Sequence, residues 1–211
     1  MVERKRDGAQ TSVEIRQAAA DLFFEHGYEA TSLRAVADRV GIKVGSLYNH
    51  MGGKDELLVD IMSTVLDRLH AELDEAVAGA GDEPIARLKA VIGAHIRFHA
   101  RHARETFIGN SELRSLPKEH RQTILQRRRD YEERMRLFIE DAADAAGVEL
   151  LDARLQSYAV IALGTHVASW FKLRGDVTLD RVVEVYTELS LRQLGLTEAD
   201  LSPNTVGALG A

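Results

Sequence analysis

The chain has 211 residues, 45% of them hydrophobic and 28% charged, which is enough to bury a sizeable core and to divide into one small and one larger domain. It has no cysteine, which excludes a disulfide framework, a thiolate metal site and a cysteine nucleophile; its polar N-terminus predicts no signal peptide. The net charge of −6 comes from residues 56–211, where nineteen Lys or Arg are outnumbered by twenty-five Asp or Glu, whereas residues 1–55 hold eight of each.

The expected fold class is all-α. The chain has only three prolines and long stretches of Ala, Leu, Glu and Arg, which favour helix. No alternating pattern typical of a strand extends over any length.

The stretch from Thr31 to Lys54 predicts two short helices joined by a tight turn. Thr31 and Ser32 can cap the first helix by accepting hydrogen bonds from its free amides. Gly41 ends this helix, because a left-handed backbone costs glycine little, and Ile42 anchors the turn. Between these ends, apolar residues recur at helical spacing at Leu33, Val36, Ala37 and Val40.

The second helix, from Lys43 to about His50, is rich in small and hydrogen-bonding side chains, and Leu47 is its main apolar anchor. Gly45 costs roughly 1 kcal/mol of helix propensity relative to alanine, which is understandable where the backbone must approach a partner closely. A helix-turn-helix presents its second helix to the major groove of DNA in this way. The stretch therefore predicts DNA binding, with which the even charge balance of residues 1–55 is compatible.

From about Thr11 to Leu58 the chain resembles the DNA-binding domain of the TetR family of transcriptional regulators. The resemblance rests on F-x-x-x-G-Y-x-x-T-S, followed by A-x-x-x-G-x-x-x-G-S-L-Y-x-H and K-x-x-L. It implies an N-terminal, three-helix DNA-binding domain over residues 1–55. A larger helical domain for ligand binding and dimerisation would cover residues 56–196, and residues 197–211 would form a flexible tail.

The resemblance also implies roles for individual residues. Base edges or the groove wall would contact Lys43, Val44, Gly45, Tyr48 and Asn49. Phosphates would contact Thr31, Ser32, Ser46, Tyr48, His50 and Lys54, and Arg34 could reach either. The alternatives are structural: Tyr48 half in the core, His50 as a helix cap and Lys54 as a solvated charge. The basic run Arg4, Lys5 and Arg6 is either an arm that contacts DNA or a disordered tail.

Six further helices are predicted after the helix-turn-helix. The first joins the two domains, so a tilt at one end would move the DNA-binding domain at the other. The stretch from Tyr158 to Leu173 is the most apolar but is too short to span a bilayer, so no membrane partner is expected. The predicted ranges are Lys54 to about Ala78, Pro84 to about Arg101, Arg104 to Ser115, Pro117 to Ala146, Leu151 to about Leu173, and Thr178 to about Leu194.

The last two helices carry the expected dimer contact. Small side chains follow one part of the first helix at Ala159, Ala162, Thr165 and Ala168 or Ser169. A stripe on the second helix contains Val182, Val183, Tyr186, Leu189 and Leu194. Because apolar surface would remain after one chain's core is filled, these helices should pair with their symmetry mates in a four-helix bundle. Two DNA-binding domains about 34 to 36 Å apart would then meet successive major grooves of a palindromic operator.

The middle helices should surround a small-molecule site, because their inward positions mix apolar and polar groups. An unpartnered buried polar group costs roughly 1 to 3 kcal/mol, so the mixture indicates either an internal hydrogen-bond network or a cavity for a ligand. The predicted ligand-binding residues are His95, His99, Phe107, Asn110, Arg128, Tyr131, Met135, Phe138, His166 and Trp170.

Neither a metal, a cofactor nor an enzymatic activity is expected. His95, His99 and His102 could share a helical face with a spacing that suits zinc or nickel, but nearby arginines would oppose a cation. An enzyme would need convergent catalytic groups, yet no Gly-rich phosphate loop, HExxH or G-x-S-x-G is present. A small-molecule carrier that has lost DNA binding is another alternative, but the intact Ser46, Tyr48, His50 and Lys54 argue against it.

Residues 109–142 are similar to the corresponding region of the fatty-acid and steroid catabolism branch of the family, whose members respond to acyl-CoA thioesters. Arg127, Arg128 and Arg129 could contact CoA phosphates, or could pair with neighbouring acids on a solvated helix face. The expected function is that of a cytoplasmic, homodimeric repressor, released from double-stranded operator DNA by a small-molecule effector such as an acyl-CoA. A regulator of an efflux or other catabolic operon that responds to a hydrophobic or aromatic ligand is the alternative.

Overall fold

A computed structural model describes residues 8–196 of the protein, and all regular structure in that range is helical, as the sequence predicts. The chain forms two compact units. The first contains the described residues up to His70 together with Arg101–Asp130 and Ala168–Phe171, and the second contains Ala71–Ala100, Tyr131–Val167 and the described residues from Lys172 onward. The predicted basic arm at Arg4 to Arg6 and the predicted tail over residues 197–211 lie outside the described residues.

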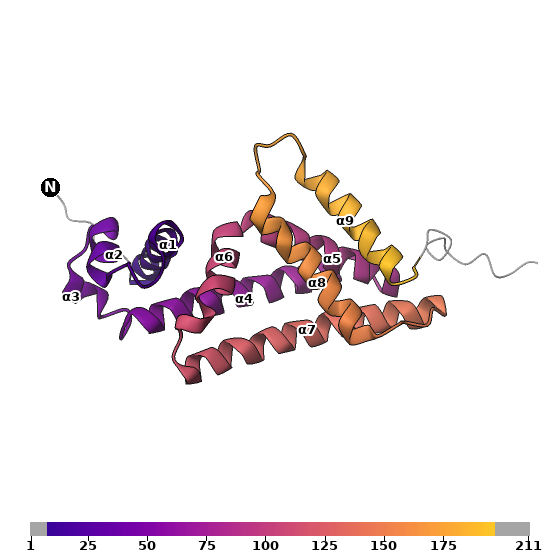
Figure 1. Ribbon diagram of the computed structural model, residues 1–211, viewed down its shortest axis with the longest axis horizontal. Coiled ribbons are helices and arrows are strands. Elements are labelled where there is room, and N and C mark those ends of the chain that lie inside the picture. Colours follow the sequence, from indigo (N-terminus) through magenta and orange to yellow (C-terminus); the bar gives the residue numbers. More distant parts are fainter. Residues whose placement is uncertain (1–7, 197–211) are drawn as a thin grey trace, which may run out of the picture. The chain divides into compact units, whose positions relative to one another are not determined.

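The first unit begins with α1 (Gly8–His26), against which α2 (Leu33–Val40) packs, and α3 (Val44–Leu47) packs against α2 (Figure 1). The hydroxyl of Ser32 caps α2 by accepting a hydrogen bond from the amide of Ala35 at 3.1 Å. Gly41 ends α2 in the left-handed region with φ of 73°, where a side chain would be strained. The predicted caps at Ser32 and Gly41 are therefore confirmed.

The second helix of the helix-turn-helix is shorter than predicted. It ends at Leu47, and residues 48–50 form a turn in which the amides of Asn49 and His50 donate to carbonyls three residues earlier. Leu47 is the single buried side chain of α3. Because most helical stability in proteins comes from packing, one apolar anchor holds about one turn.

The core of the first unit draws on residues far outside the helix-turn-helix. The start of α4 (Lys54–Gly79) contributes Leu57, Leu58 and Ile61 to the same cluster as Phe23 and Leu47. That cluster also contains Ile108 from α6 (Ala103–Ser111), Leu116 after η1 (Glu112–Ser115), and Ile124 from α7 (Lys118–Ala146). The first 55 residues therefore do not close this core alone.

The second unit contains α9 (Leu179–Gln193), nearly all of α5 (Pro84–Arg101), most of α8 (Ala153–Trp170), and the later parts of α4 and α7. A side-chain carbon added at Gly164 on α8 would lie 2.3 Å from the imidazole of His95 on α5, so glycine permits this close approach. On α9, Val182 and Val183 are buried, as is Leu194 just after it. The predicted external stripe on this helix is therefore wrong at these three positions, because they fill the core of their own chain.

None of the helices between residues 8 and 196 combines the length and apolar character that crossing a bilayer requires.

Candidate DNA-binding surface and effector site

The helix-turn-helix presents a mostly polar surface. Tyr48 is 54% exposed, although Leu47 before it is fully buried. Val44 and Lys54 are half-buried. The remaining predicted contacts that reach the surface are Ser32, Arg34, Lys43, Gly45, Ser46, Asn49 and His50. A hydrogen-bonding surface of this kind on a short helix is suited to a DNA groove.

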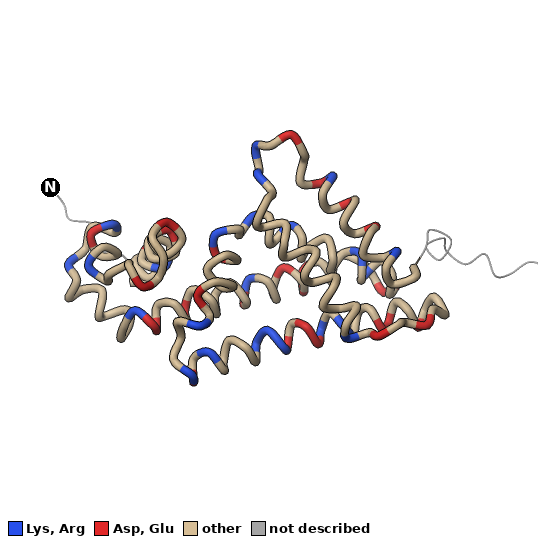
Figure 2. The backbone as a smooth tube through the Cα atoms, viewed as in Figure 1, with Lys and Arg blue, Asp and Glu red and all other residues tan. Residues whose placement is uncertain are grey.

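The helix-turn-helix segment itself has an excess of cations. Residues 31–54 contain four Lys or Arg against one Asp, a balance of +3, and Figure 2 shows them along the segment. Arg39 pairs with Glu25 at 3.0 Å, and Arg34 lies 4.0 Å from Asp38. Within residues 8–196, no acidic side chain pairs with Lys43, so its charge is available to a phosphate or a base edge.

Thr31 does not belong to this surface, contrary to prediction. Its side chain is 4% exposed. Its hydroxyl is the donor to both the carbonyl of Gly27, at 2.8 Å, and the carbonyl of Leu22, at 3.2 Å. Thr31 therefore ties the end of α1 to the start of α2. The sequence placed it beside a helix cap, but the cap is Ser32 and the neighbouring hydroxyl points into the core.

Lys54 is held by the loop between α1 and α2. Its ammonium donates to the carbonyls of Tyr28 at 2.9 Å and Glu29 at 3.3 Å, and lies 4.2 Å from the centre of the Tyr28 ring. These contacts fix the charge at the first residue of α4. A phosphate contact from its third N–H stays a prediction.

His50 is tied to the other end of α1. Its Nδ1 lies 2.9 Å from Oγ of Ser12, a residue 38 positions away. No spacing or periodicity in the sequence links these two positions. The contact depends on how α1 packs beside the helix-turn-helix.

The second unit contains a buried hydrogen-bond network among the predicted ligand-binding residues. His95 is fully buried; its Nε2 donates to the carbonyl of Ile161 at 3.1 Å, and its Nδ1 accepts from the hydroxyl of Tyr131 at 2.5 Å. Oγ1 of Thr165 lies 3.4 Å from Nε2 of both His95 and His99. The sequence left two possibilities, an internal hydrogen-bond network or a cavity for a ligand. These groups form an internal network. Thr165, which was predicted to belong to the external dimer contact, thus faces the histidines instead.

Burial fixes the protonation states of this network. It lowers the pKa of His95 to about 4, an effect that the hydrogen bond to the Ile161 carbonyl opposes only in part. Burial also raises the pKa of Tyr131. A neutral imidazole and a protonated phenol are what the hydrogen bond from Tyr131 to His95 requires.

Four of the predicted ligand-binding residues are not inward-facing, contrary to expectation. Phe107 is 52% exposed and meets the ring of Phe24 edge-on, with centroids 5.4 Å apart. Trp170 is 41% exposed, and Asn110 and His166 are also exposed. The inward face of α6 is formed instead by Thr106 and Ile108. By contrast, Met135 is buried and Phe138 half-buried in the second unit, as predicted for an interior site.

The three consecutive arginines of α7 have partners in the first unit. Arg127 pairs with Asp67 and donates to the Ser63 carbonyl at 3.4 Å. Arg128 donates to the carbonyl of Gly109 at 2.6 Å and lies 3.5 Å from Oδ1 of Asn110. Arg129 donates to the neutral amide of Gln126 at 2.6 and 3.1 Å, which leaves its charge uncompensated by that contact.

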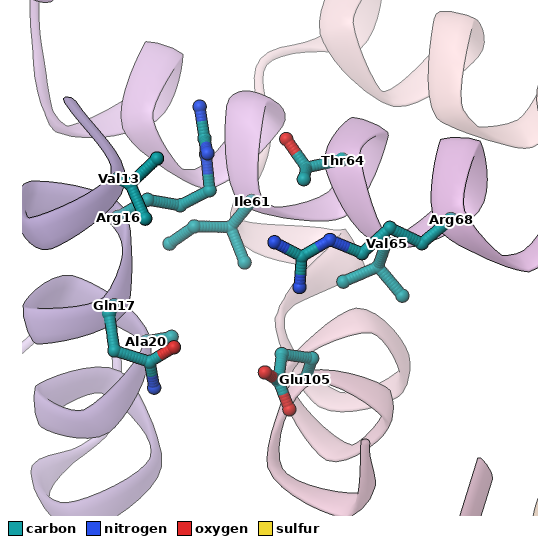
Figure 3. A pocket seen from close by; sticks show the side chains of 9 residues that line it. All are labelled: Val13, Arg16, Gln17, Ala20, Ile61, Thr64, Val65, Arg68 and Glu105. Atoms are coloured by element: carbon teal, nitrogen blue, oxygen red, sulfur yellow. The ribbon is translucent and has the colours of Figure 1, made fainter. Parts of the chain in front are cut away.

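A small cavity lies within the first unit among α1, α4 and α6 (Figure 3). Its volume of about 30 Å³ is enough for one or two water molecules but not for an acyl chain. The walls mix both signs of charge with apolar groups. Its lining residues are Val13, Arg16, Gln17, Ala20, Ile61, Thr64, Val65, Arg68 and Glu105.

Two family models match the chain. The model of bacterial regulatory proteins of the tetR family matches residues 15–61, and the model of the Tetracyclin repressor-like C-terminal domain matches residues 81–194. The HTH-type transcriptional repressor KstR2 of Rhodococcus jostii is 29% identical over 185 residues, which cover 84% of this chain and 88% of that repressor. KstR2 of Mycobacterium tuberculosis is 27% identical over 180 residues, covering 84% and 90%.

Solved structures have the same fold. A bacterial regulatory protein in the tetR family from Rhodococcus RHA1 superimposes with a TM-score of 0.79 at 29% identity, covering 89% of this chain and 98% of that one. AibR, solved in complex with isovaleryl coenzyme A and operator DNA, has a TM-score of 0.76 at 23% identity, covering 85% and 97%. At that identity the likeness to AibR concerns the fold alone.

The buried state of His95 predicts a specific pH dependence of stability. Its folded pKa of about 4 lies below the unfolded value of about 6.5, so the unfolded chain binds the proton first and stability falls as pH drops through this window. Between pH 7 and pH 5 the loss due to His95 should be about 2 kcal/mol. Urea unfolding of wild type and His95→Gln at both pH values isolates the contribution of His95, because the two proteins share all other titrating groups. An equal difference between the two proteins at pH 7 and pH 5 would contradict the assignment.

Proposed function

Because the chain belongs to the TetR family of bacterial regulatory proteins, we propose that it is a transcriptional repressor that binds a palindromic DNA operator as a homodimer and is released by a small-molecule effector. The observation that carries the proposal is the exposed, cation-rich surface of residues 31–54, held on a buried Leu47. The KstR2 relatives are transcriptional repressors. Residues 1–55 form the DNA-binding domain, residues 56–196 bind effector and partner subunit, and a DNA partner places the protein in the cytoplasm.

DNA contacts are divided by chemistry. Lys43, Asn49 and Tyr48 contact base edges or the groove wall, because their exposed side chains have hydrogen-bonding groups. Val44 and Gly45 allow close approach of α3. Phosphates are bound by Ser32, Ser46, His50 and Lys54, and Arg34 serves either purpose.

Exposed apolar side chains of α8 and α9 form the dimer contact. On α8, Leu155 is 62% exposed, and Ala159, Ala162, Ser169 and Trp170 lie on the surface at helical spacing. On α9, Leu189 is exposed and Tyr186 half-buried. Exposed large apolar groups on neighbouring turns of a helix are typical of a protein interface. A four-helix contact with the symmetry mate covers them.

The effector is proposed to be an acyl-CoA thioester. AibR was solved with isovaleryl coenzyme A and operator DNA, which makes this ligand class compatible with the fold. The acyl part contacts Met135 and Phe138, and its carbonyl exchanges hydrogen bonds with His95, His99 or Tyr131. Breaking the buried network is costly unless a ligand replaces the lost partners, so occupancy selects a different arrangement of the helices that carry it.

Gly45→Ala separates folding from DNA binding. A side-chain carbon added at residue 45 would have no other heavy atom within 4 Å of it in the free protein. Because alanine favours helix more than glycine does, the stability of the fold should be unchanged or raised by up to about 1 kcal/mol. The same carbon would occupy the groove wall and should weaken operator affinity roughly tenfold or more, about 1.4 kcal/mol. Fluorescence anisotropy with DNA from upstream of the protein's own gene measures this, and wild-type affinity should fall steeply with salt.

The matched control is Gly79→Ala, because Gly79 ends α4 and also has open space around it. Its operator affinity should equal that of wild type. Absence of DNA binding by wild type would contradict the proposed function. Equal affinity of Gly45→Ala and wild type would contradict the close approach of α3 to DNA.

Titration of the operator complex tests the effector class. Acyl-CoAs should dissociate the complex, and free CoA or the free fatty acid should act only at much higher concentration. Arg129→Gln should raise the required acyl-CoA concentration if its uncompensated charge contacts a CoA phosphate, and Arg121→Gln on the same helix is the control. Release by a hydrophobic or aromatic compound lacking CoA, with no response to acyl-CoAs, would favour the efflux-type regulator instead.

A further inference from the structure

Ser12 is placed to control the orientation of His50. It lies on the first turns of α1 between two anchors, because Thr11 and Ile15 are both buried. Its Oγ is 2.9 Å from Nδ1 of His50, which follows α3 and whose backbone amide donates to the Leu47 carbonyl at 2.9 Å. The backbone of His50 is thus held by α3, and its imidazole is held at one ring nitrogen by α1.

The hydroxyl of Ser12 has a single proton and two acceptors within reach. The carbonyl of Gly8 lies 3.0 Å from Oγ, and Nδ1 of His50 lies 2.9 Å from it. When the proton points to Gly8, Oγ can only accept from an Nδ1–H group. When it points to His50, Nδ1 is the acceptor and the neutral ring carries its proton on Nε2.

Phosphate oxygens accept hydrogen bonds, so a nitrogen that contacts DNA must carry a proton. Because Nδ1 is engaged by Ser12, the nitrogen left for a phosphate is Nε2. A neutral His50 can donate from Nε2 only if Ser12 donates to Nδ1. A charged His50 carries both protons, and Ser12 then accepts from Nδ1–H. In both states Ser12 holds the same edge of the ring.

We propose that Ser12 is a positioning residue for DNA binding, whose hydroxyl holds Nδ1 of His50 so that Nε2–H faces a DNA phosphate. The inference rests on the proposed function, since it assigns His50 to a phosphate. Fixing the ring in advance removes part of the ordering cost at the moment of binding. DNA binding also directs the Ser12 proton toward His50 at the expense of the Gly8 carbonyl whenever the ring is neutral.

A double-mutant cycle on the full-length protein tests this role. Ser12→Ala should weaken operator affinity at least about fivefold, because a hydrogen bond is lost in both DNA-binding domains of the dimer. In the His50→Ala background the same substitution should change affinity less than about twofold. Ser12→Thr keeps a hydroxyl and should restore most of the affinity. A fivefold loss that persists without His50, or no loss in Ser12→Ala, would overturn the proposal.

Nitrogen-15 NMR of the imidazole gives a readout that general damage to α1 would not produce. In the operator complex of wild type, Nε2 of His50 should be protonated, and Ser12→Ala should alter the Nδ1 signal before DNA is added. A complex in which Nδ1 is the sole protonated nitrogen would overturn the assignment. If His50→Ala weakens binding but Ser12→Ala does not, this inference fails alone. If wild type binds no operator, the proposed function fails and the inference with it.

Discussion

The structure depends on one shared hydrophobic core, in which Ile108, Leu116 and Ile124 pack into the same cluster as Phe23 and Leu47. The helix-turn-helix is too small to bury its apolar faces within 55 residues, and α3 contributes one buried side chain. Completion of the core by α6 and α7 therefore sets the position of the DNA-binding surface. A second set of contacts at the same junction joins α6 to α1, through the Arg104–Asp21 pair at 2.8 Å and the edge-on meeting of Phe24 and Phe107.

This core bears on how the proposed effector could release DNA. A single helix, α7, carries both Ile124 in the core of the first unit and Tyr131 in the hydrogen-bond network of His95. The two residues are seven positions apart, about two helical turns. Under the proposed function, a ligand that rearranges the partners of Tyr131 would act on a helix whose preceding turns pack into the core of the first unit, and packed cores shift between discrete arrangements. We propose α7 as a second route for the effector signal, beside the lever that the sequence predicts for α4.

Local rules in the sequence predicted local structure well. Ser32 and Gly41 act where capping chemistry and backbone strain place them, and the later helices begin and end within a few residues of their predicted ends. What failed depends on tertiary packing. Thr31 and Ser32 are chemically alike, yet one is buried and the other is the cap; Val182 and Val183 look like free apolar surface until α5 packs against α9. For the same reason the contact of Ser12 with His50 had no signal in the sequence.

The candidate effector site shows the same division. The mixture of polar and apolar groups at His95, His99 and Tyr131 indicated a network or a cavity, and the network was found. Periodicity could not place Phe107, Asn110, His166 and Trp170, because each helix has one face toward its own core and sequence alone does not say which face remains outside.

The most direct test of the shared core is hydrogen–deuterium exchange in Ile108→Val, compared with Ile139→Val. Both isoleucines are fully buried, and Ile139 belongs to the part of α7 in the second unit. Each substitution should cost about 1 kcal/mol. The shared core predicts that Ile108→Val speeds exchange at the amides of α1, α2 and α3 as well as of α6, and that Ile139→Val leaves α1 to α3 unchanged. Faster exchange confined to α6 and α7 in Ile108→Val would contradict it.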